Sequence, residues 1–171
     1  NAKTPIFFDA SDAGTGKTAT RIWRFAERRK KNGKCILVLG LRSTLASVWA
    51  ADFKKFAPAL KTSVATAANR EAAFAVTADA YITNHDAVKW LAKQPKGFFD
   101  KFSELVIDES TVFKHHTSQR SKAAVKVSKF FKHRVCMTAT PNGNTICDVW
   151  HQVLLLDGGK RLGPSFYGFR N

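Results

Sequence analysis

The sequence is poor in long hydrophobic runs, in cysteine and in acidic side chains. Its longest apolar stretches, such as residues 35–39, have about five or six residues, far fewer than the ~18 needed to cross a bilayer, and no leader-like segment comes before the first apolar run. We therefore expect neither a membrane span nor a signal peptide. The three cysteines are odd in number and far apart, which excludes a disulfide framework and favours reduced core thiols in a cytoplasmic protein.

The sequence does contain enough apolar surface for one ordinary core. It has 171 residues, of which 44% are hydrophobic, with 14 Phe and 4 Trp. This composition excludes an intrinsically disordered chain, and the length predicts a single domain. There is no internal repeat, low-complexity stretch or linker, so we expect no domain boundary within residues 1–171.

The scarcity of acids gives the chain a strong positive charge. There are 28 Lys and Arg against 13 Asp and Glu, and the formal net charge is +15. No acidic residue lies between Glu109 and Asp148, whereas seven basic ones do. A nucleic acid, as a polyanion, is the natural partner of such a chain. Helical spacing predicts two rows of cations, each of which by itself is typical of a solvated helix face: Lys122, Lys126 and Lys129, and Arg21, Arg24, Arg28 and Lys31.

Short apolar runs alternate with helical patterns along the whole chain. The predicted strands are 5–8, 35–39, 81–83, 105–107 and 135–137, with a weaker one at 63–65. The predicted helices are 16–31, 43–56, 84–94, 118–131 and 144–155, each with apolar residues three or four positions apart. Buried strands that alternate with helices form parallel sheets through crossover connections. The fold class that we expect is three-layer α/β with a mostly parallel central sheet.

A glycine-rich loop, Ser-Asp-Ala-Gly-Thr-Gly-Lys-Thr at residues 11–18, separates the first predicted strand from the first predicted helix. Its backbone N–H groups and the positive end of the following helix can surround phosphate oxygens. The ammonium of Lys17 would reach the β and γ phosphates, and the hydroxyl of Thr18 would ligate Mg²⁺. The loop therefore predicts a nucleoside triphosphate site made of Gly14, Thr15, Gly16, Lys17 and Thr18.

The second half of that site is predicted at the end of an apolar strand, where residues 105–109 read Leu-Val-Ile-Asp-Glu. Asp108 would hold Mg²⁺ at the carboxyl edge of the sheet, and Glu109 would polarise the attacking water. The pairing of Asp with Glu favours hydrolysis over phosphate transfer to a second substrate. The predicted catalytic residues are Lys17, Asp108 and Glu109.

In these motifs the chain resembles helicase superfamily two, and within it the Swi/Snf-like ATPases, particularly the compact versions from phages and prophages. Residues 14–18 look like the first motif of that family and residues 108–111 like its DExx box. Residues 137–144, Met-Thr-Ala-Thr-Pro-Asn-Gly-Asn, are similar to the motif that links the nucleotide state to movement on DNA, with Ala139 where Gly is usual. Leu-Leu-Asp-Gly-Gly at 155–159 also resembles the phage-type proteins. The coupling residues that the resemblance implies are Thr138, Ala139, Thr140 and Asn144.

The resemblance implies a RecA-like P-loop NTPase fold, ATP and Mg²⁺ as cofactors, and DNA as the partner, with duplex favoured over a single strand. For a phage protein the location would be the cytoplasm of the bacterial host. Leu45, Trp49 and Phe53 match a family helix that lies beside nucleic acid, but they also line one apolar face, so we expect core packing for the two aromatics. Residues 82–86 match a second such segment. The nucleic-acid candidates are Arg42, Thr44, Thr83 and His85.

Motors of the family that this chain resembles have two RecA-like lobes, and the second lobe supplies an arginine finger to the ATP. A second lobe needs ~150 further residues, so we expect residues 1–171 to be the first lobe of a longer protein, truncated at both ends. Without a finger worth ~10³–10⁵ in rate, this lobe would bind ATP but hydrolyse it slowly. Two alternatives remain: a non-enzymatic nucleic-acid-binding module on a P-loop scaffold, and another P-loop enzyme, although the Asn-Lys-x-Asp motif of GTPases is missing.

Overall fold

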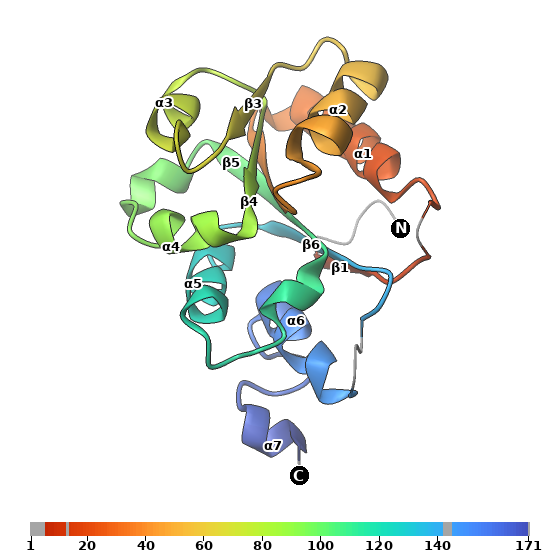
Figure 1. Ribbon diagram of the computed structural model, residues 1–171, viewed down its shortest axis with the longest axis vertical. Helices are drawn as coiled ribbons and strands as arrows, with labels where there is room; N and C mark the ends of the chain where they lie inside the picture. Colours follow the sequence, from red (N-terminus) through yellow and green to blue (C-terminus); the bar gives the residue numbers. More distant parts are fainter. Residues whose placement is uncertain (1–5, 13, 142–144, 171) are drawn as a thin grey trace.

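The chain folds around a six-stranded parallel sheet with the strand order β1-β6-β5-β2-β4-β3 (Figure 1). The structure, a computed structural model, describes residues 6–12, 14–141 and 145–170. The strands are β1 (Ile6–Asp9), β2 (Cys35–Gly40), β3 (Thr62–Ala65), β4 (Ala80–Asn84), β5 (Phe102–Asp108) and β6 (His133–Met137). The expected α/β class is confirmed, and all six predicted strands are present.

The helices differ from the sequence prediction more than the strands do. The helices are α1 (Lys17–Asn32), α2 (Ala51–Phe56), α3 (Arg70–Ala75), α4 (Val88–Leu91), α5 (Gln119–Ser128), α6 (Cys147–Asp157) and α7 (Phe166–Arg170). There are also a π-helix, η1 (Leu45–Ala50), and three 3₁₀ turns, η2 (His85–Ala87), η3 (Lys96–Phe99) and η4 (Ser110–Phe113). No helix in the described part of the chain is both long enough and apolar enough to span a membrane.

Two predicted helices are each divided in the structure, and two short ones were not predicted. The helix expected over 43–56 is η1 followed by α2, and the helix expected over 84–94 is η2 followed by the single turn of α4. Hydrophobic spacing does not distinguish a π-helix or a 3₁₀ turn from an α-helix, because all three can bury one face. The unpredicted helices, α3 and α7, are too short to give a periodic pattern.

Each face of the sheet carries its own hydrophobic core. On one face, α1, η1 and α2 bury Ile22, Trp49 and Phe53 against the central strands. On the other face, α4 and α5 bury Leu91 and Val127, with side chains of α6 beside them. Figure 1 shows α1 and α2 on one side of the sheet and α4, α5 and α6 on the other. Core packing of Trp49 and Phe53 is confirmed, because neither side chain is exposed.

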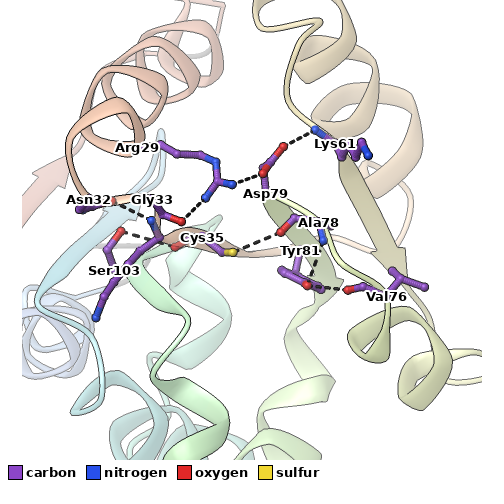
Figure 2. Close-up of polar contacts among 11 residues, drawn as sticks. Arg29, Asn32, Gly33, Cys35, Lys61, Val76, Ala78, Asp79, Tyr81 and Ser103 are labelled. Atoms are coloured by element: carbon purple, nitrogen blue, oxygen red, sulfur yellow. Dashed lines mark hydrogen bonds and ion pairs between the residues drawn. The ribbon is translucent and has the colours of Figure 1, made fainter.

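Polar contacts fasten α1 to the amino edge of the sheet, at the start of β2, β3 and β4. Arg29, in the last turn of α1, forms an ion pair with Asp79 and donates to the carbonyl oxygen of Gly33 at 2.6 Å. Asp79 also accepts from the backbone N–H of Lys61 at 2.6 Å. Figure 2 shows Arg29 and Asp79 spanning the gap between helix and strands. These contacts fix α1 at this edge, so the loop before α1 lies at the opposite, carboxyl edge.

Only part of the cationic row on α1 forms the solvated face that its spacing indicated: Lys31 is exposed and Arg24 is half-exposed, whereas Arg21 and Arg28 turn inward. Arg21 is only 3% exposed, lies 3.6 Å from a carboxylate oxygen of Asp9, and stacks over Phe7. Arg28 pairs with Glu104 inside the fold. These two arginines turn inward because β1 and β5 present carboxylates to them. The row on α5 does face outward, since its members are all exposed: Lys122, Lys126 and Lys129.

The three cysteines are free thiols, as expected. Cys35 and Cys136 are buried, and Cys35 lies with its sulfur 3.2 Å from the carbonyl oxygen of Ala78 (Figure 2). Burial raises the pKa of Cys136 to about 12 and that of Cys35 above its ordinary value. Both thiols therefore stay protonated at neutral pH and act as small core residues.

We expect His151 to make the fold sensitive to mild acid. It is only 2% exposed on α6, and burial lowers its pKa to about 4, with nearby His116 acting in the same direction. The unfolded chain therefore binds a proton at higher pH than the folded chain does, so stability is lost as pH falls from ~6.5 toward 4. This residue should lower the free energy of unfolding by about 2 kcal/mol between pH 7.5 and pH 5.

Urea unfolding at the two pH values, for wild type and for His151→Gln, measures this contribution. The variant should lose that part of the pH dependence because glutamine does not titrate. His115→Gln, at an exposed position, is the matched control and should behave like wild type. Equal pH dependence in wild type and His151→Gln would contradict the assignment.

Candidate nucleotide site

Three neighbouring strands end side by side at the carboxyl edge of the sheet, and each brings one of the sequence motifs. In the parallel ladders Asp9 is paired with Met137, and Met137 is paired with Asp108. The phosphate loop follows Asp9, and Asp108 begins the DExx segment. Because adjacent strands are ~4.8 Å apart, the two motifs lie about two strand spacings from each other. The acid is therefore on the edge where the sequence predicted it.

The glycine-rich loop has the backbone shape that brings N–H groups inward. Gly14 and Gly16 have φ values of 78° and 75°, in the left-handed region that other residues avoid. Lys17 begins α1, and its ammonium donates to the carbonyl oxygens of Ser11 and, at 3.0 Å, Asp12. The first turn of α1 holds no acidic side chain, so no carboxylate of the helix itself offsets its positive end. The loop is thus a concave, cationic surface suited to an anion.

A cleft of about 310 Å³ lies beside this loop. Its lining is Gly14, Gly16, Lys17, Thr18, Ala19, Asp52 and Phe56. A larger groove of about 620 Å³ lies farther along α1 and α2, between Trp23 and Leu60, and includes no residue of the three motifs. We assign the site to the smaller cleft because the phosphate-binding backbone is there, whereas the larger groove is mainly apolar.

Asp108 is held by groups from three different elements. The indole N–H of Trp49 donates to one carboxylate oxygen at 2.8 Å, and the backbone N–H of Glu109 donates to the other at 3.0 Å. The ring Nε2 of His85 lies 2.6 Å from the carbonyl oxygen of Asp108, so this nitrogen carries the proton. Burial lowers the pKa of His85, which keeps the ring neutral near pH 7. The acid is therefore fixed in both position and orientation.

Glu109 adopts a strained backbone conformation beside the acid. Its φ of 50° is the only positive value for a non-glycine residue in the described ranges. Such conformations cost about 1–3 kcal/mol and are concentrated at functional sites. Its carboxylate accepts from the hydroxyls of Thr138, at 2.9 Å, and Thr111, at 3.1 Å. The strained turn directs the Glu109 side chain toward the segment that follows β6.

The segment after β6 connects both other motifs. The backbone N–H of Thr138 donates to the carbonyl oxygen of Asp9 at 3.0 Å, while its hydroxyl donates to Glu109. The hydroxyl oxygen of Thr138 also accepts from the backbone N–H of Thr140 at 3.1 Å. Ala139 is half-buried between these threonines, and Asn144 lies outside the described residues. One threonine thus contacts the strand that carries the phosphate loop and the predicted base.

The oxygen donors of the site fit a magnesium ion that is shared with a nucleotide. No group of three or more His, Cys, Asp or Glu side chains that could hold a metal occurs in the ranges that the structure describes. Mg²⁺ in nucleotide sites needs only one or two protein ligands, because phosphates and water supply the rest. The carboxylate of Asp108 and the hydroxyl of Thr18 are the hard oxygen ligands that it prefers.

Only two of the four nucleic-acid candidates lie on the surface. Arg42 is exposed and Thr44 is half-exposed in the turn between β2 and η1. Thr83 has no exposed surface, and its hydroxyl donates to the carbonyl oxygen of Ala65 at 2.8 Å. His85 is 5% exposed, and its ring nitrogen donates to the carbonyl oxygen of Asp108. Thr83, in β4, and His85, in η2, are therefore buried and do not offer a surface to nucleic acid in this structure, which differs from what their place in the sequence led us to expect.

Sequence reasoning missed three polar groups that join the motifs. Asp9 accepts from the backbone N–H of Ser11 at 3.2 Å, and Trp49 donates to the predicted acid. Gln152, fully buried on α6, accepts from the hydroxyl of Ser110 at 2.6 Å and donates to the carbonyl oxygen of Pro141 at 2.7 Å. A glutamine inside an apolar helix was a usable signal, whereas nothing in the pattern separated Trp49 from an ordinary core aromatic.

Sequence comparison relates the chain to helicase-like ATPases. Residues 4–160 match the SNF2-related domain. An uncharacterized ATP-dependent helicase of Mycoplasma pneumoniae is 31% identical over 150 residues, which cover 82% of this chain and 14% of that protein. Putative protein p41 of Acyrthosiphon pisum secondary endosymbiont phage 1 is 29% identical over 168 residues, covering 91% of this chain and 36% of that protein. The chain thus spans well under half the length of these relatives.

Structural comparison gives the same relationship. The Sulfolobus solfataricus SWI2/SNF2 ATPase core in complex with dsDNA matches with a TM-score of 0.76 and 25% identity, over 96% of this chain and 33% of that one. A structure of the Sulfolobus SWI2/SNF2 ATPase core domain matches with a TM-score of 0.72 and 26% identity, over 96% and 32% of the two chains. The similarity covers almost all of this chain and about a third of each neighbour.

Proposed function

Because the chain belongs to the SNF2-related family and has the RecA-like α/β fold of SNF2 ATPase cores, we propose that it is the ATP-binding lobe of a DNA-dependent ATPase that translocates on DNA. The observation that carries this proposal is the arrangement of three strand ends: Asp9, Met137 and Asp108 are adjacent in the ladders. The phosphate loop, the acidic motif and the coupling segment therefore share one edge. The phage relative agrees with the phage-type character of the sequence.

The residues of the site divide the chemistry of ATP hydrolysis among them. The backbone N–H groups of residues 14–16 would bind the β and γ phosphates, and the Lys17 ammonium would leave its loop carbonyls for phosphate oxygens. Thr18 and Asp108 would hold Mg²⁺, which neutralises charge on the phosphates. Glu109 would orient and deprotonate the attacking water. The strained backbone of Glu109 and its bond to Thr138 support that role, because both fix its carboxylate.

Coupling to DNA would use the segment after β6 and the turn after β2. Thr138, Ala139 and Thr140 lie between the predicted base and the surface, so a change at the γ phosphate can move this segment. Arg42 would offer an exposed guanidinium to phosphates of the DNA backbone. Thr44 would have to exchange an existing contact, because its hydroxyl and its backbone N–H both donate to the carbonyl oxygen of Leu41, at 3.0 Å and 2.9 Å. The net charge of +15 favours such a contact with any nucleic acid.

A second RecA-like lobe would complete the cleft. This chain corresponds to about a third of the Sulfolobus chain, which leaves room for another domain in a protein of that length. In the proposal the second lobe supplies an arginine finger, worth roughly 10³–10⁵ in rate. The 171-residue chain alone should therefore hydrolyse ATP hardly above background, and added DNA should give little stimulation.

The proposal predicts that nucleotide and duplex DNA affect each other's binding. Fluorescence anisotropy with labelled DNA should give an affinity that changes roughly fivefold or more when a non-hydrolysable MgATP analogue is added. The change should vanish in Lys17→Ala, which keeps the rest of the basic surface. A non-enzymatic binding module, the alternative, would be insensitive to nucleotide and to Lys17. Its affinity for duplex DNA would fall steeply with salt, with a log-log slope near −4.5 for ~5 phosphate contacts.

A further inference from the structure

The helix after β2 contains an irregularity that sets the position of Trp49. Residues Leu45–Ala50 form a π-helix, in which the backbone N–H groups of Val48 and Trp49 share the carbonyl oxygen of Thr44, at 3.0 Å and 3.1 Å. π-Helical turns are rare and frequently occur at functional sites. The wider turn rotates Trp49 relative to the α-helical register. In this protein the rotation directs the indole toward the carboxyl edge of the sheet.

The indole of Trp49 lies beside Gly40, the last residue of β2. A Cβ atom built on Gly40 would lie 3.6 Å from Cδ1 and 3.7 Å from Nε1 of Trp49, which is van der Waals contact. The ring therefore rests directly on the end of β2 and reaches across to the neighbouring strand β5. There its N–H donates to Oδ2 of Asp108 at 2.8 Å. Trp49 has no exposed surface, so water does not compete for this hydrogen bond.

The indole limits what the Asp108 carboxylate can do. An indole N–H is a donor only, so Oδ2 must act as the acceptor, while Oδ1 accepts from the N–H of Glu109 at 3.0 Å. With both oxygens engaged by fixed donors, rotation about the side chain is blocked. The lone pairs that remain point in set directions. Outer donors that orient a ligand in this way typically change metal affinity by about 10–100-fold when they are removed.

We propose that Trp49 is a positioning residue that orients the Asp108 carboxylate toward the magnesium ion of the bound nucleotide. The inference rests on the proposed function and adds a role to a side chain that otherwise belongs to the hydrophobic core. It follows that the indole N–H contributes to magnesium-dependent nucleotide binding. It should not contribute to binding of the nucleotide without metal, because neither Trp49 nor the Asp108 carboxylate that it orients lines the loop cleft.

The test uses calorimetry to compare ATP binding in magnesium with ATP binding in EDTA. It begins with wild type, Trp49→Phe and Trp150→Phe. Trp49→Phe keeps the aromatic bulk and removes the N–H, so the gain in affinity that magnesium provides should fall about tenfold, with metal-free affinity unchanged. Trp150→Phe is the matched control. Trp150 lies on α6, and the change removes its buried indole N–H, which donates to the carbonyl oxygen of Gly163 at 3.1 Å. This control should match wild type in both conditions.

Two results would overturn the inference. The first is that magnesium still increases the ATP affinity of Trp49→Phe as much as that of wild type, although Asp108→Asn has lost this increase. The second is that Trp49→Phe loses affinity equally with and without magnesium, which indicates altered packing. A wild type without any magnesium gain would refute the proposed function as well, so the two failures are distinguishable. In the double variant Trp49→Phe/Asp108→Asn, the first change should have no further effect on the magnesium gain.

A measurement on the wild-type chain covers the case in which Trp49→Phe does not fold. The protein has 4 Trp, so its indole N–H groups give four NMR signals, and Trp23→Phe, Trp90→Phe and Trp150→Phe assign the fourth to Trp49 by elimination. The Trp49 signal should shift when magnesium is added to the ATP complex. An unchanged Trp49 signal, with magnesium bound, would contradict the proposal.

Discussion

Lys17→Ala should abolish ATP binding at concentrations where wild type is saturated. The Lys17 ammonium is held at the mouth of the loop by two backbone carbonyls, where a triphosphate would receive it. Hydrogen bonds to charged groups contribute about 1.5–3 kcal/mol each, so losing contacts to two phosphates weakens binding by roughly 100-fold or more. Titration calorimetry with MgATP measures this loss directly.

The matched control is Lys30→Ala on the same helix. Lys30 is exposed and pairs with Glu27, and such surface pairs contribute only about 0–1 kcal/mol. The ATP affinity of Lys30→Ala should equal that of wild type. Thermal unfolding of Lys17→Ala should be close to wild type as well, since the side chain contacts only loop carbonyls. Undiminished ATP binding by a folded Lys17→Ala protein would refute the nucleotide site.

Arg28→Met should strongly destabilise the fold. Two guanidinium nitrogens of Arg28 donate to Oε2 of Glu104, at 3.0 Å and 2.5 Å, and Glu104 has no exposed surface. Its other oxygen, Oε1, is buried without a hydrogen-bond partner. Removing Arg28 takes away the hydrogen-bonded partner of a buried carboxylate and leaves only the more distant charges of Arg21 and Arg24 to compensate it, which costs about 3–5 kcal/mol of unfolding free energy at pH 7.5.

The loss of unfolding free energy in Arg28→Met should be smaller at acidic pH. Burial raises the pKa of Glu104 in the folded protein, and Arg28 opposes that rise. The stability contribution of a carboxyl with a raised pKa is full below its unfolded value, near 4.3, and is lost as pH rises through the folded value. Without Arg28 the folded pKa is higher still, so the variant differs most from wild type at neutral pH and least near pH 4.5.

Urea unfolding at both pH values tests this account against two controls. The double variant Arg28→Met/Glu104→Leu replaces both partners with apolar groups and should recover most of the stability at pH 7.5. Lys31→Met, at an exposed position on the same helix, should change stability by less than ~0.5 kcal/mol. A loss in Arg28→Met that is the same at both pH values, or that the double variant does not recover, would contradict the charge-based explanation.

The local parts of the site could be predicted from sequence because they depend on neighbouring residues. The turn that contains Gly14 and Gly16 needs only glycines at two positions to bring N–H groups together. β5 is buried except at its last residue, Asp108, which is half-buried, so the change from apolar to acidic residues in the sequence marks the end of the strand. Helix interruptions were not predictable in the same way, because η1 and α2 bury Leu45, Trp49 and Phe53 on one continuous apolar face that an unbroken helix would also have.

Local sequence patterns were enough to predict the six strands and the longer helices, the phosphate loop, the acidic motif and the basic character of the chain. Tertiary structure alone decided which side chains meet across the sheet. Trp49 and Asp108 are 59 residues apart, Arg28 and Glu104 are 76 apart, and Ser110 and Gln152 are 42 apart. Strand order places these residues together, and it depends on the burial of whole faces rather than on any local pattern. For that reason the row on α1 looked like a solvated face, although two of its arginines neutralise carboxylates inside the fold.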